Sequence, residues 1–417
     1  MDLLRLATAG SVDDGKSTLI GRLLFDAKAI LADQLEHVEE VSRRRGADVP
    51  DLALLTDGLR AEREQGITID VAYRYFATPT RKFILADTPG HVQYTRNMVT
   101  GASTADLAIV LVDARHGVVE QTRRHAFLAS LLGIRHLVLA VNKMDLVGWD
   151  QATFQAVVAD FAALEGRLGV PDVVAIPISA LLGDNVVEHS ANLPWYDGPA
   201  LLEHLECVEV AEDAALDGAR FPVQYVIRDQ ATDYRGYAGQ VAGGILRVGD
   251  EVAVLPGGRT TTVAAIDVHE GQLAAAPAGR SVTVRLADDI DVARGDLLVA
   301  GAPAGVKGGI PVPTRLLDAE VCWMAEAPLR AGGRYALKHT TSTVRAIVDT
   351  VSDRLDVTTL EPVPGPAELG LNDIGRVALR VSRELAVDPY AVNRATGAFI
   401  LVDEASNETV GAGMVRG

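Results

Sequence analysis

Near its beginning the chain reads Gly10-Ser11-Val12-Asp13-Asp14-Gly15-Lys16-Ser17-Thr18. The apolar residues 3–9 predict a short buried strand, and residues 17–25 have the apolar periodicity of a helix. A glycine-rich loop between a strand and a helix, ending in Gly-Lys-Ser, is typical of a phosphate-binding loop. Backbone N–H groups and the helix N-terminus bind phosphates there. We expect all nine residues to contact a nucleotide, with Lys16 placing its charge on the phosphates and Ser17 binding Mg²⁺.

A second motif, Asp87-Thr88-Pro89-Gly90-His91, ends a predicted strand over residues 81–87. A carboxylate at that strand end suits a water-mediated contact between Asp87 and Mg²⁺. The N–H of Gly90 can meet the γ-phosphate, and we expect Thr88 and Pro89 to line the same site. The alternative is an ordinary turn built from Thr-Pro-Gly.

The third motif, Asn142-Lys143-Met144-Asp145, follows an apolar run over residues 136–142 and predicts recognition of a base. Asp145 can accept hydrogen bonds from guanine N1–H and the 2-amino group, which adenine lacks, and such a site rejects the wrong ligand by ~10⁴. Asn142 would support the loop, and the stem of Lys143 can lie over the ring. Backbone N–H groups of Ser179-Ala180-Leu181 can reach the guanine oxygen. The predicted ligands are GTP or GDP with Mg²⁺.

Two further residues, with Lys16, form the predicted catalytic set. The hydroxyl of Thr68, in Glu64-Gln65-Gly66-Ile67-Thr68-Ile69, can complete the Mg²⁺ shell only while the γ-phosphate is present. His91 can orient the attacking water, and the sequence leaves open whether it acts as a base or only positions the water. The alternatives are a strand threonine and a surface histidine. Because the sequence assigns no arginine to the reaction, we expect slow intrinsic turnover that a partner accelerates.

The spacing of apolar runs predicts the fold of the first half. Runs of strand length without alternation indicate strands covered on both faces, and helical stretches lie between them. This pattern favours a doubly wound, mostly parallel sheet, with each motif directly after a strand. We place this α/β G domain at residues 1–205. The remaining predicted strands lie at 106–113 and 173–178, and helices at 28–46, 117–133 and 150–168.

The pattern changes after about residue 205. Residues 207–219 are acidic and alanine-rich and predict a linker, and from Phe221 short strands alternate with glycine-rich turns. Even spacing of short strands is typical of an antiparallel β-barrel. A glycine- and proline-rich break at 301–313 separates a second such region. We therefore predict two barrels, at residues 220–306 and 312–417.

Composition restricts the class of partner and the compartment. A net charge of −17 over 417 residues opposes binding to a nucleic acid through the field of the whole molecule. We find no apolar run of about 18 residues, which predicts no membrane span, and no secretory signal. Cys207 and Cys322 lie far apart, so reduced thiols in the cytoplasm are expected.

With these motifs placed, the chain resembles the translation-factor GTPases, which have one G domain and two barrels. Within that superfamily it is most similar to the GTPase subunit (subunit 1) of bacterial sulfate adenylyltransferase, along essentially the whole chain. The resemblance is carried by residues 10–24, 61–76, 95–106, 121–125, 388–390 and 393–397.

The resemblance implies a GTPase subunit in sulfate assimilation. Its hydrolysis of GTP would drive a separate catalytic adenylyltransferase subunit to make adenosine 5′-phosphosulfate from ATP and sulfate. Some relatives also carry a fused adenylylsulfate kinase with a second phosphate loop. This sequence, which ends at Gly417, has no second such motif, so a kinase is either a separate partner or absent by truncation.

Two other functions remain open from the sequence. One is a translation elongation factor that delivers aminoacyl-tRNA, although such relatives usually carry His-Gly-Lys-Thr where Asp14-Gly15-Lys16-Ser17 stands here. The other is an assembly module that holds its nucleotide without turnover. Neither the partner interface and stoichiometry nor the timing of hydrolysis against adenylyl transfer follows from the sequence.

Overall fold

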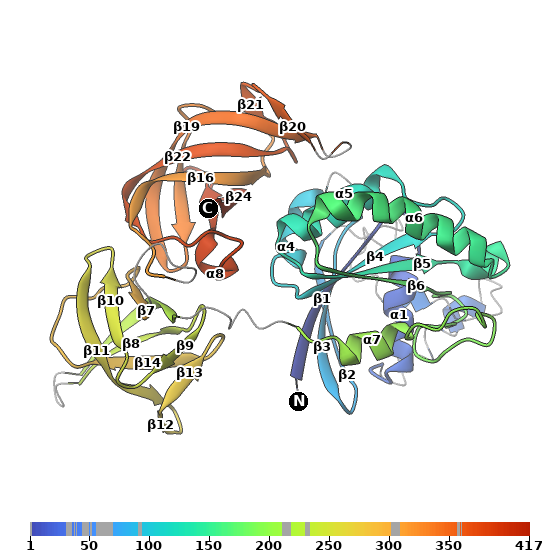
Figure 1. The fold of residues 1–417 in the computed structure, drawn as a ribbon, viewed down its shortest axis with the longest axis horizontal. Coiled ribbons are helices and arrows are strands. Elements are labelled where there is room, and N and C mark those ends of the chain that lie inside the picture. The colour runs from blue at the N-terminus through green and yellow to red at the C-terminus, as the bar shows by residue number, and fades with distance from the viewer. Residues whose placement is uncertain are drawn as a thin grey trace. The chain divides into compact units, whose positions relative to one another are not determined.

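The computed structural model describes residues 2–30, 36, 38, 40–43, 50, 52–55, 70–90, 94–210, 218–229, 234–301, 309–356, 359 and 361–417. The chain divides into two compact units, the first ending at Val210. Figure 1 shows the first unit as a sheet flanked by helices and the second as two β-structures. The predicted fold class is confirmed, whereas the domain boundaries at 205, 220–306 and 312–417 stay predictions.

The first unit is built on a six-stranded sheet. Neighbouring strands pair in parallel, except that β2 pairs antiparallel with β3. The sequence did not predict β2, which lies at the edge of the sheet. Across the sheet the strands are β2 (Ala72–Ala77), β3 (Arg81–Asp87), β1 (Asp2–Gly10), β4 (Leu107–Asp113), β5 (His136–Asn142) and β6 (Asp172–Pro177).

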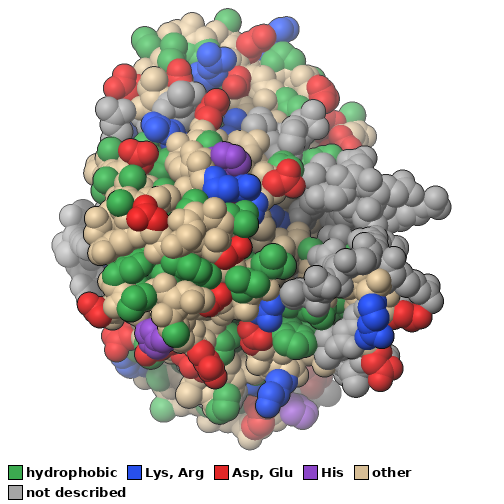
Figure 2. Space-filling model, turned by 90° about the vertical axis from the view of Figure 1, so that its right-hand side faces the viewer, with side chains coloured by type: hydrophobic (Ala, Val, Ile, Leu, Met, Phe, Trp, Pro, Cys, Tyr) green, Lys and Arg blue, Asp and Glu red, His purple; other side chains and the backbone are tan. Residues whose placement is uncertain are grey.

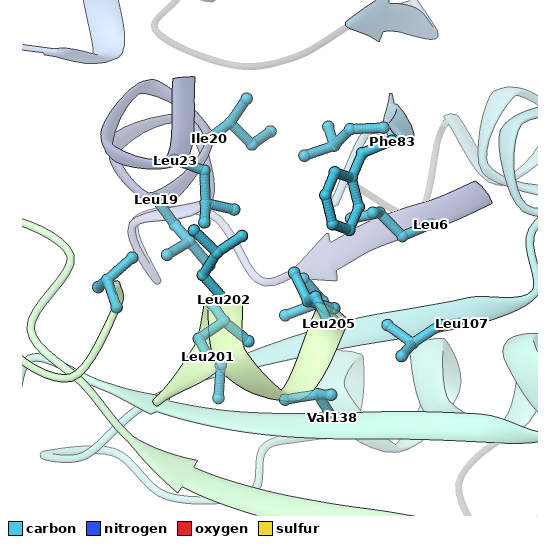
Figure 3. Packing of buried hydrophobic residues seen from close by; sticks show 14 of the residues in the cluster. Leu6, Leu19, Ile20, Leu23, Phe83, Leu107, Val138, Leu201, Leu202 and Leu205 are labelled. Carbon is cyan, nitrogen blue, oxygen red and sulfur yellow. The ribbon is translucent and has the colours of Figure 1, made fainter. Parts of the chain in front are cut away.

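Helices cover both faces of this sheet, so its central strands are buried on both sides. On β4, Ile109 and Leu111 belong to the core that includes α1 and α7, whereas Val110 and Val112 belong to the core that includes α5 and α6. Figure 3 shows leucines of α1 and α7 facing Leu6 of β1. The described helices are α1 (Lys16–Asp26), η1 (Leu52–Leu55), α4 (Thr95–Ala102), α5 (Glu120–Leu131), η3 (Met144–Val147), α6 (Gln151–Leu168) and α7 (Leu201–Cys207).

Two predicted helices begin later than the sequence indicated. Lys28, with φ 54°, lies in a turn after α1, and the rest of the range 28–46 falls partly outside the described residues. The helix expected from 117 begins at Glu120, because Gly117 takes a left-handed φ of 68°.

The second unit begins with a closed antiparallel barrel. Its ring runs β10–β15–β7–β8–β14–β11 and closes through the pairing of β10 with β11. Buried apolar side chains of these strands fill the interior, with Phe221 and Tyr237 among the largest. The elements are β7 (Arg220–Asp229), β8 (Tyr234–Gln240), β9 (Ile245–Arg247), β10 (Glu251–Leu255), β11 (Arg259–Val268), β12 (Gly271–Leu273), β13 (Ala275–Pro277), β14 (Ser281–Leu286) and β15 (Leu297–Val299).

A second closed barrel follows. Its ring runs β18–β23–β24–β16–β22–β19 and closes through β18 with β19, around a core that includes Trp323. The elements are β16 (Thr314–Trp323), β17 (Leu329–Arg330), β18 (Arg334–His339), β19 (Ser342–Asp356), β20 (Glu361–Pro364), β21 (Glu368–Leu369), β22 (Ile374–Leu385), α8 (Arg394–Gly397), β23 (Ala398–Val402) and β24 (Thr409–Val415).

A buried ion pair joins the two barrels within the second unit. The guanidinium of Arg220, at the start of β7, donates from Nε and Nη2 to the two carboxylate oxygens of Asp388, each at 3.0 Å. Neither side chain is more than 5% exposed. Thr396 also donates to Asp388, at 2.6 Å. Each carboxylate oxygen therefore accepts a hydrogen bond, which a buried charge requires.

Candidate functional site

The predicted nucleotide-binding residues gather at one edge of the first unit's sheet. β1 ends at Gly10, β3 at Asp87 and β5 at Asn142, and Ser179-Ala180-Leu181 follows the end of β6 at Pro177. These strands are parallel, so their carboxyl ends share one edge of the sheet. Ligands of open α/β sheets bind outside this edge.

The loop from Gly10 to Lys16 is held in shape by the Asp14 side chain and by the close approach of Gly15 to Asn142. The carboxylate of Asp14 accepts the N–H of Ser11 at 2.7 Å, and burial raises the pKa of that carboxyl. Gly15 has a φ of 93°, and a Cβ there would lie 2.5 Å from Nδ2 of Asn142. Only glycine therefore fits between the loop and β5.

Two observations show that this loop suits an anion. Among the described residues no side chain caps the N-terminus of α1, which begins at Lys16, so its first N–H groups have no side-chain acceptor there. The hydroxyl of Ser11 is buried and has no hydrogen-bond partner of good geometry within the described part of the chain. Phosphate oxygens would satisfy both kinds of donor. Val12 and Asp13 lie in the loop, and Ser17 and Thr18 in the first turn of α1.

The second motif lies directly against the first. Lys16 Nζ forms a buried ion pair with Asp87 Oδ1, and Thr88 Oγ1 donates to the carbonyl of Thr8 at 2.6 Å. A Cβ on Gly90 would lie 2.1 Å from the carbonyl oxygen of Gly10, so only glycine allows this approach of the two backbones. Pro89 lies in the same irregular segment.

The third motif is bonded to the phosphate loop. Asn142, 2% exposed, donates from Nδ2 to the carbonyl of Asp14 at 2.7 Å. Lys143, which has a left-handed φ of 64°, donates from Nζ to the carbonyl of Asp13. Met144 is buried in the core, and Asp145 follows it in η3. No hydrogen bond to the Asp145 carboxylate is formed among the described residues.

The segment Ser179-Ala180-Leu181 is also bonded to the third motif. The N–H of Ala180 donates to Oδ1 of Asn142 at 2.9 Å, and the N–H of Ser179 donates to the carbonyl of Asp184 at 3.1 Å. The N–H of Leu181 has no such acceptor among the described residues, which leaves it as the donor of this segment available to a base.

The sequence did not predict two residues that contact this site. Arg22 of α1 donates to the carbonyls of Ala180 and Leu181, at 3.3 and 2.6 Å, and so fixes the segment that would face the base. His125 of α5 lies 3.1 Å from the carbonyl of Gly90 through Nε2, and burial lowers its pKa to about 4. A neutral imidazole therefore donates to that carbonyl. A helical arginine and a helical histidine carry no motif of their own, so only the long-range contacts reveal them.

Thr68 and His91 lie outside the described residues, so their predicted roles stay predictions. Among the described residues no cluster of three or more His, Cys, Asp and Glu side chains could hold a metal ion.

Figure 2 shows acidic and basic side chains interspersed with apolar ones over the described part of one face.

Cys207 and Cys322 are both free thiols, as expected. None of the helices in the described ranges is long and apolar enough to cross a membrane.

Comparison with known families agrees with this geometry. The family model described as the elongation factor Tu GTP binding domain matches residues 1–217, and the GTP-eEF1A C-terminal domain-like model matches residues 316–416. The class is therefore the translation-factor type of GTPase.

Individual relatives identify the family within this class of GTPases. "Sulfate adenylyltransferase subunit 1" of Laribacter hongkongensis is 52% identical over 418 residues, covering 100% of this chain and 85% of that protein. "Bifunctional enzyme CysN/CysC" of Mycobacterium tuberculosis is 61% identical over 417 residues, covering 99% of this chain and 67% of that protein. The chain belongs to the sulfate adenylyltransferase subunit 1 family, as its GTPase subunit. These relatives do not favour the alternative of an elongation factor that delivers aminoacyl-tRNA.

Proposed function

We propose that this chain binds GTP with Mg²⁺ at the edge of its parallel sheet and hydrolyses it. The free energy of GTP hydrolysis drives a separate catalytic subunit, which transfers the adenylyl group of ATP to sulfate to form adenosine 5′-phosphosulfate and releases pyrophosphate. One observation carries the nucleotide site: direct bonds link the phosphate loop to Asp87, to Asn142 and Lys143, and through Asn142 to Ala180. We assign the phosphate loop to the phosphates, Asp87 to the metal, and the segments that contain Asn142, Lys143 and Ala180 to the base.

The phosphates would be held by the loop from Gly10 to Gly15 and the first turn of α1. Two features of the described residues support this assignment: the Ser11 hydroxyl has no hydrogen-bond partner among them, and none of their side chains caps the start of α1. Lys16 would exchange its partner Asp87 for the β- and γ-phosphates. This exchange frees the Asp87 carboxylate at the moment the phosphates arrive.

Asp87, Ser17 and Thr68 are the proposed Mg²⁺ ligands, Asp87 through water. When bound, the metal neutralises charge that develops on the β- and γ-phosphates. Because Lys16 and Asp87 form a buried pair, neither charge stands alone before the nucleotide binds.

Asp145 would select guanine, and His91 would orient the attacking water. Two observations support the role of Asp145. Its carboxylate accepts no hydrogen bond among the described residues. Asn142 bonds to the phosphate loop and to Ala180, and Arg22 bonds to Leu181, so the segments around the base position are fixed. His125 holds the carbonyl of Gly90, the residue directly before His91.

The partner is proposed from the family. The GTP-bound state must bind one conformation of the complex better than the GDP-bound state does, because a ligand shifts an equilibrium only by its differential affinity. An adenylylsulfate kinase is a further candidate partner, in line with the bifunctional relative. The net charge of −17 supports a protein partner over a nucleic acid, and we place the complex in the cytoplasm.

The test is reconstitution of this chain with a catalytic adenylyltransferase subunit. Formation of adenosine phosphosulfate from ATP and sulfate should rise with GTP and not with a non-hydrolysable analogue. His91→Ala should keep GTP binding and lose the stimulation, since binding and hydrolysis use different residues. Equal product with and without GTP would refute coupling, and retention of charged tRNA on a filter would favour the elongation-factor alternative.

A further inference from the structure

A buried carboxylate lies next to the nucleotide site and belongs to none of its motifs. Asp113 is the last residue of β4, between β1 and β5 in the sheet, and its side chain is 2% exposed. Its end of the strand is the edge that carries the phosphate loop and the third motif. A buried carboxylate must be compensated by donors, and Asp113 has several.

Lys143 is the donor that connects Asp113 to the site. Its Nζ lies 2.9 Å from Oδ2 of Asp113 and also donates to the carbonyl of Asp13 in the phosphate loop. The ammonium is therefore held between the end of β4 and the phosphate loop. With its head fixed at two points, the aliphatic stem of Lys143 has little freedom, and the stem is the part that would lie over a base.

Arg115 compensates the same carboxylate from the solvent side. It donates to Asp113 from its backbone N at 2.9 Å, from Nε at 3.0 Å and from Nη2 at 2.6 Å, while its side chain stays 43% exposed. Burial alone would raise the pKa of Asp113, but hydrogen bonds from Arg115 and Lys143 outweigh it and hold the pKa well below the usual value. Asp113 is therefore charged throughout the physiological range.

We propose that Asp113 is a positioning residue for retention of the guanine nucleotide: it anchors the ammonium of Lys143 so that the stem closes one face of the base pocket. The inference rests on the proposed binding of GTP and GDP. Asp113 touches no base or phosphate itself, so it acts only through Lys143. Arg115 keeps Asp113 charged and oriented and is not needed to hold the base.

A double-mutant cycle on nucleotide release tests this chain of contacts. The full chain is loaded with a fluorescent GDP, and dissociation is followed after adding excess GDP. Asp113→Asn keeps the size of the side chain but removes its charge, and should speed release on the order of 10-fold, as for losing one hydrogen bond to a charged group. In a Lys143→Met background the same change should alter release by no more than about twofold.

Asp106→Asn is the matched control. Asp106 directly precedes β4, next to the opposite end of the strand, and its carboxylate accepts the N–H of Arg5 at 3.0 Å. Its replacement should leave release unchanged. Thermal unfolding of each variant without nucleotide separates loss of fold from loss of retention.

The possible outcomes distinguish the positioning role of Asp113 from the proposed binding of GTP and GDP. If Asp113→Asn speeds release equally with and without Lys143, or does not speed it at all, the positioning role is refuted while GTP binding stands. If the unaltered chain binds no fluorescent GDP, the proposed function and this inference fall together. A non-additive cycle with a silent Asp106→Asn supports the anchor.

Discussion

Replacement of Asn142 by alanine tests whether the nucleotide site is one connected structure. The Asn142 amide donates to the carbonyl of Asp14 at 2.7 Å and accepts the N–H of Ala180 at 2.9 Å. These are the bonds that tie the phosphate loop to the segment facing the base. The side chain is 2% exposed, so water does not compete for either bond in the intact protein.

The magnitude follows from what Asn142→Ala leaves behind. A buried carbonyl and a buried N–H lose their partners, and each such loss costs about 1–3 kcal/mol. A water molecule in the vacated space would bring the total toward about 2 kcal/mol. For a unit of about 200 residues this corresponds to a fall in Tm of roughly 4–8 °C. Affinity for GTP and GDP should fall together, at least about tenfold, because both need the phosphate loop and the base segment in register.

Selectivity should survive the same change. Asn142→Ala leaves the carboxylate of Asp145 in place, so the ratio of GTP to ATP affinity should stay within about threefold of that of the unaltered chain. Calorimetry with each nucleotide measures this ratio, and thermal unfolding without nucleotide measures the loss of stability.

Arg81→Met is the matched control for stability alone. Arg81 begins β3 at the opposite edge of the sheet, and its Nη1 donates to the carbonyls of Leu205 and Val208 at 3.0 and 2.7 Å. The Arg81→Met replacement should lower Tm by an amount similar to that of Asn142→Ala, and nucleotide affinity should stay unchanged. The reasoning is refuted if Asn142→Ala binds GTP as tightly as the unaltered chain, or if Arg81→Met weakens binding equally.

Four further changes have expected outcomes. Asp145→Asn should shift preference from GTP toward xanthosine triphosphate, because the amide can donate to the 2-oxygen of xanthine, and competition binding checks it. Asp87→Asn should reduce the Mg²⁺ dependence of GTP binding, since it removes the carboxylate proposed to contact Mg²⁺ through water, and calorimetry with and without Mg²⁺ checks it. The pKa of His125 is about 4 in the folded chain against 6.5 unfolded, so the unfolded state binds the proton first as pH falls. The free energy of unfolding therefore falls between pH 6.5 and about 4, and His125→Gln should flatten that fall in urea titrations. Arg220→Met should destabilise the second unit by about 3–5 kcal/mol by leaving Asp388 buried and unpaired, whereas replacing both should cost less in the same assay.

The candidate motif residues could be named from the sequence because each motif is local, and their roles stay predictions. Apolar runs without alternation located β4 and β5, and the ends of β3 and β5 place Asp87 and Asn142 at one edge of the sheet. The edge strand β2 was missed because its exposed tyrosines, Tyr73 and Tyr75, alternate with half-buried residues over only six positions. Such a short pattern resembles a loop as much as a strand.

The contacts within the site could not be predicted in the same way. Arg22, Asp113 and His125 act through partners far away in sequence, such as the 35 residues that separate His125 from Gly90. No spacing rule connects a residue in mid-helix to a particular backbone carbonyl on another loop. The close approach of Gly90 to Gly10 likewise depends on how β1 and β3 pair, which the motifs alone do not specify.

These contacts give a physical reason for the order of binding events. Lys16 pairs with Asp87 and Lys143 pairs with Asp113, so both lysines of the site have buried carboxylate partners. The Lys16–Asp87 pair must open for the phosphates to bind, because the Lys16 ammonium cannot bind Asp87 and the γ-phosphate equally well at the same time. The second pair can stay closed, because the base needs only the stem of Lys143. With the proposed site residues, phosphate binding would change the charge arrangement on the Asp87-Thr88-Pro89-Gly90 segment, whereas base binding would leave the Lys143–Asp113 pair unaltered. The part of the site proposed to respond to the terminal phosphate would then be separate from the part proposed to select guanine, as a switch that distinguishes GTP from GDP requires.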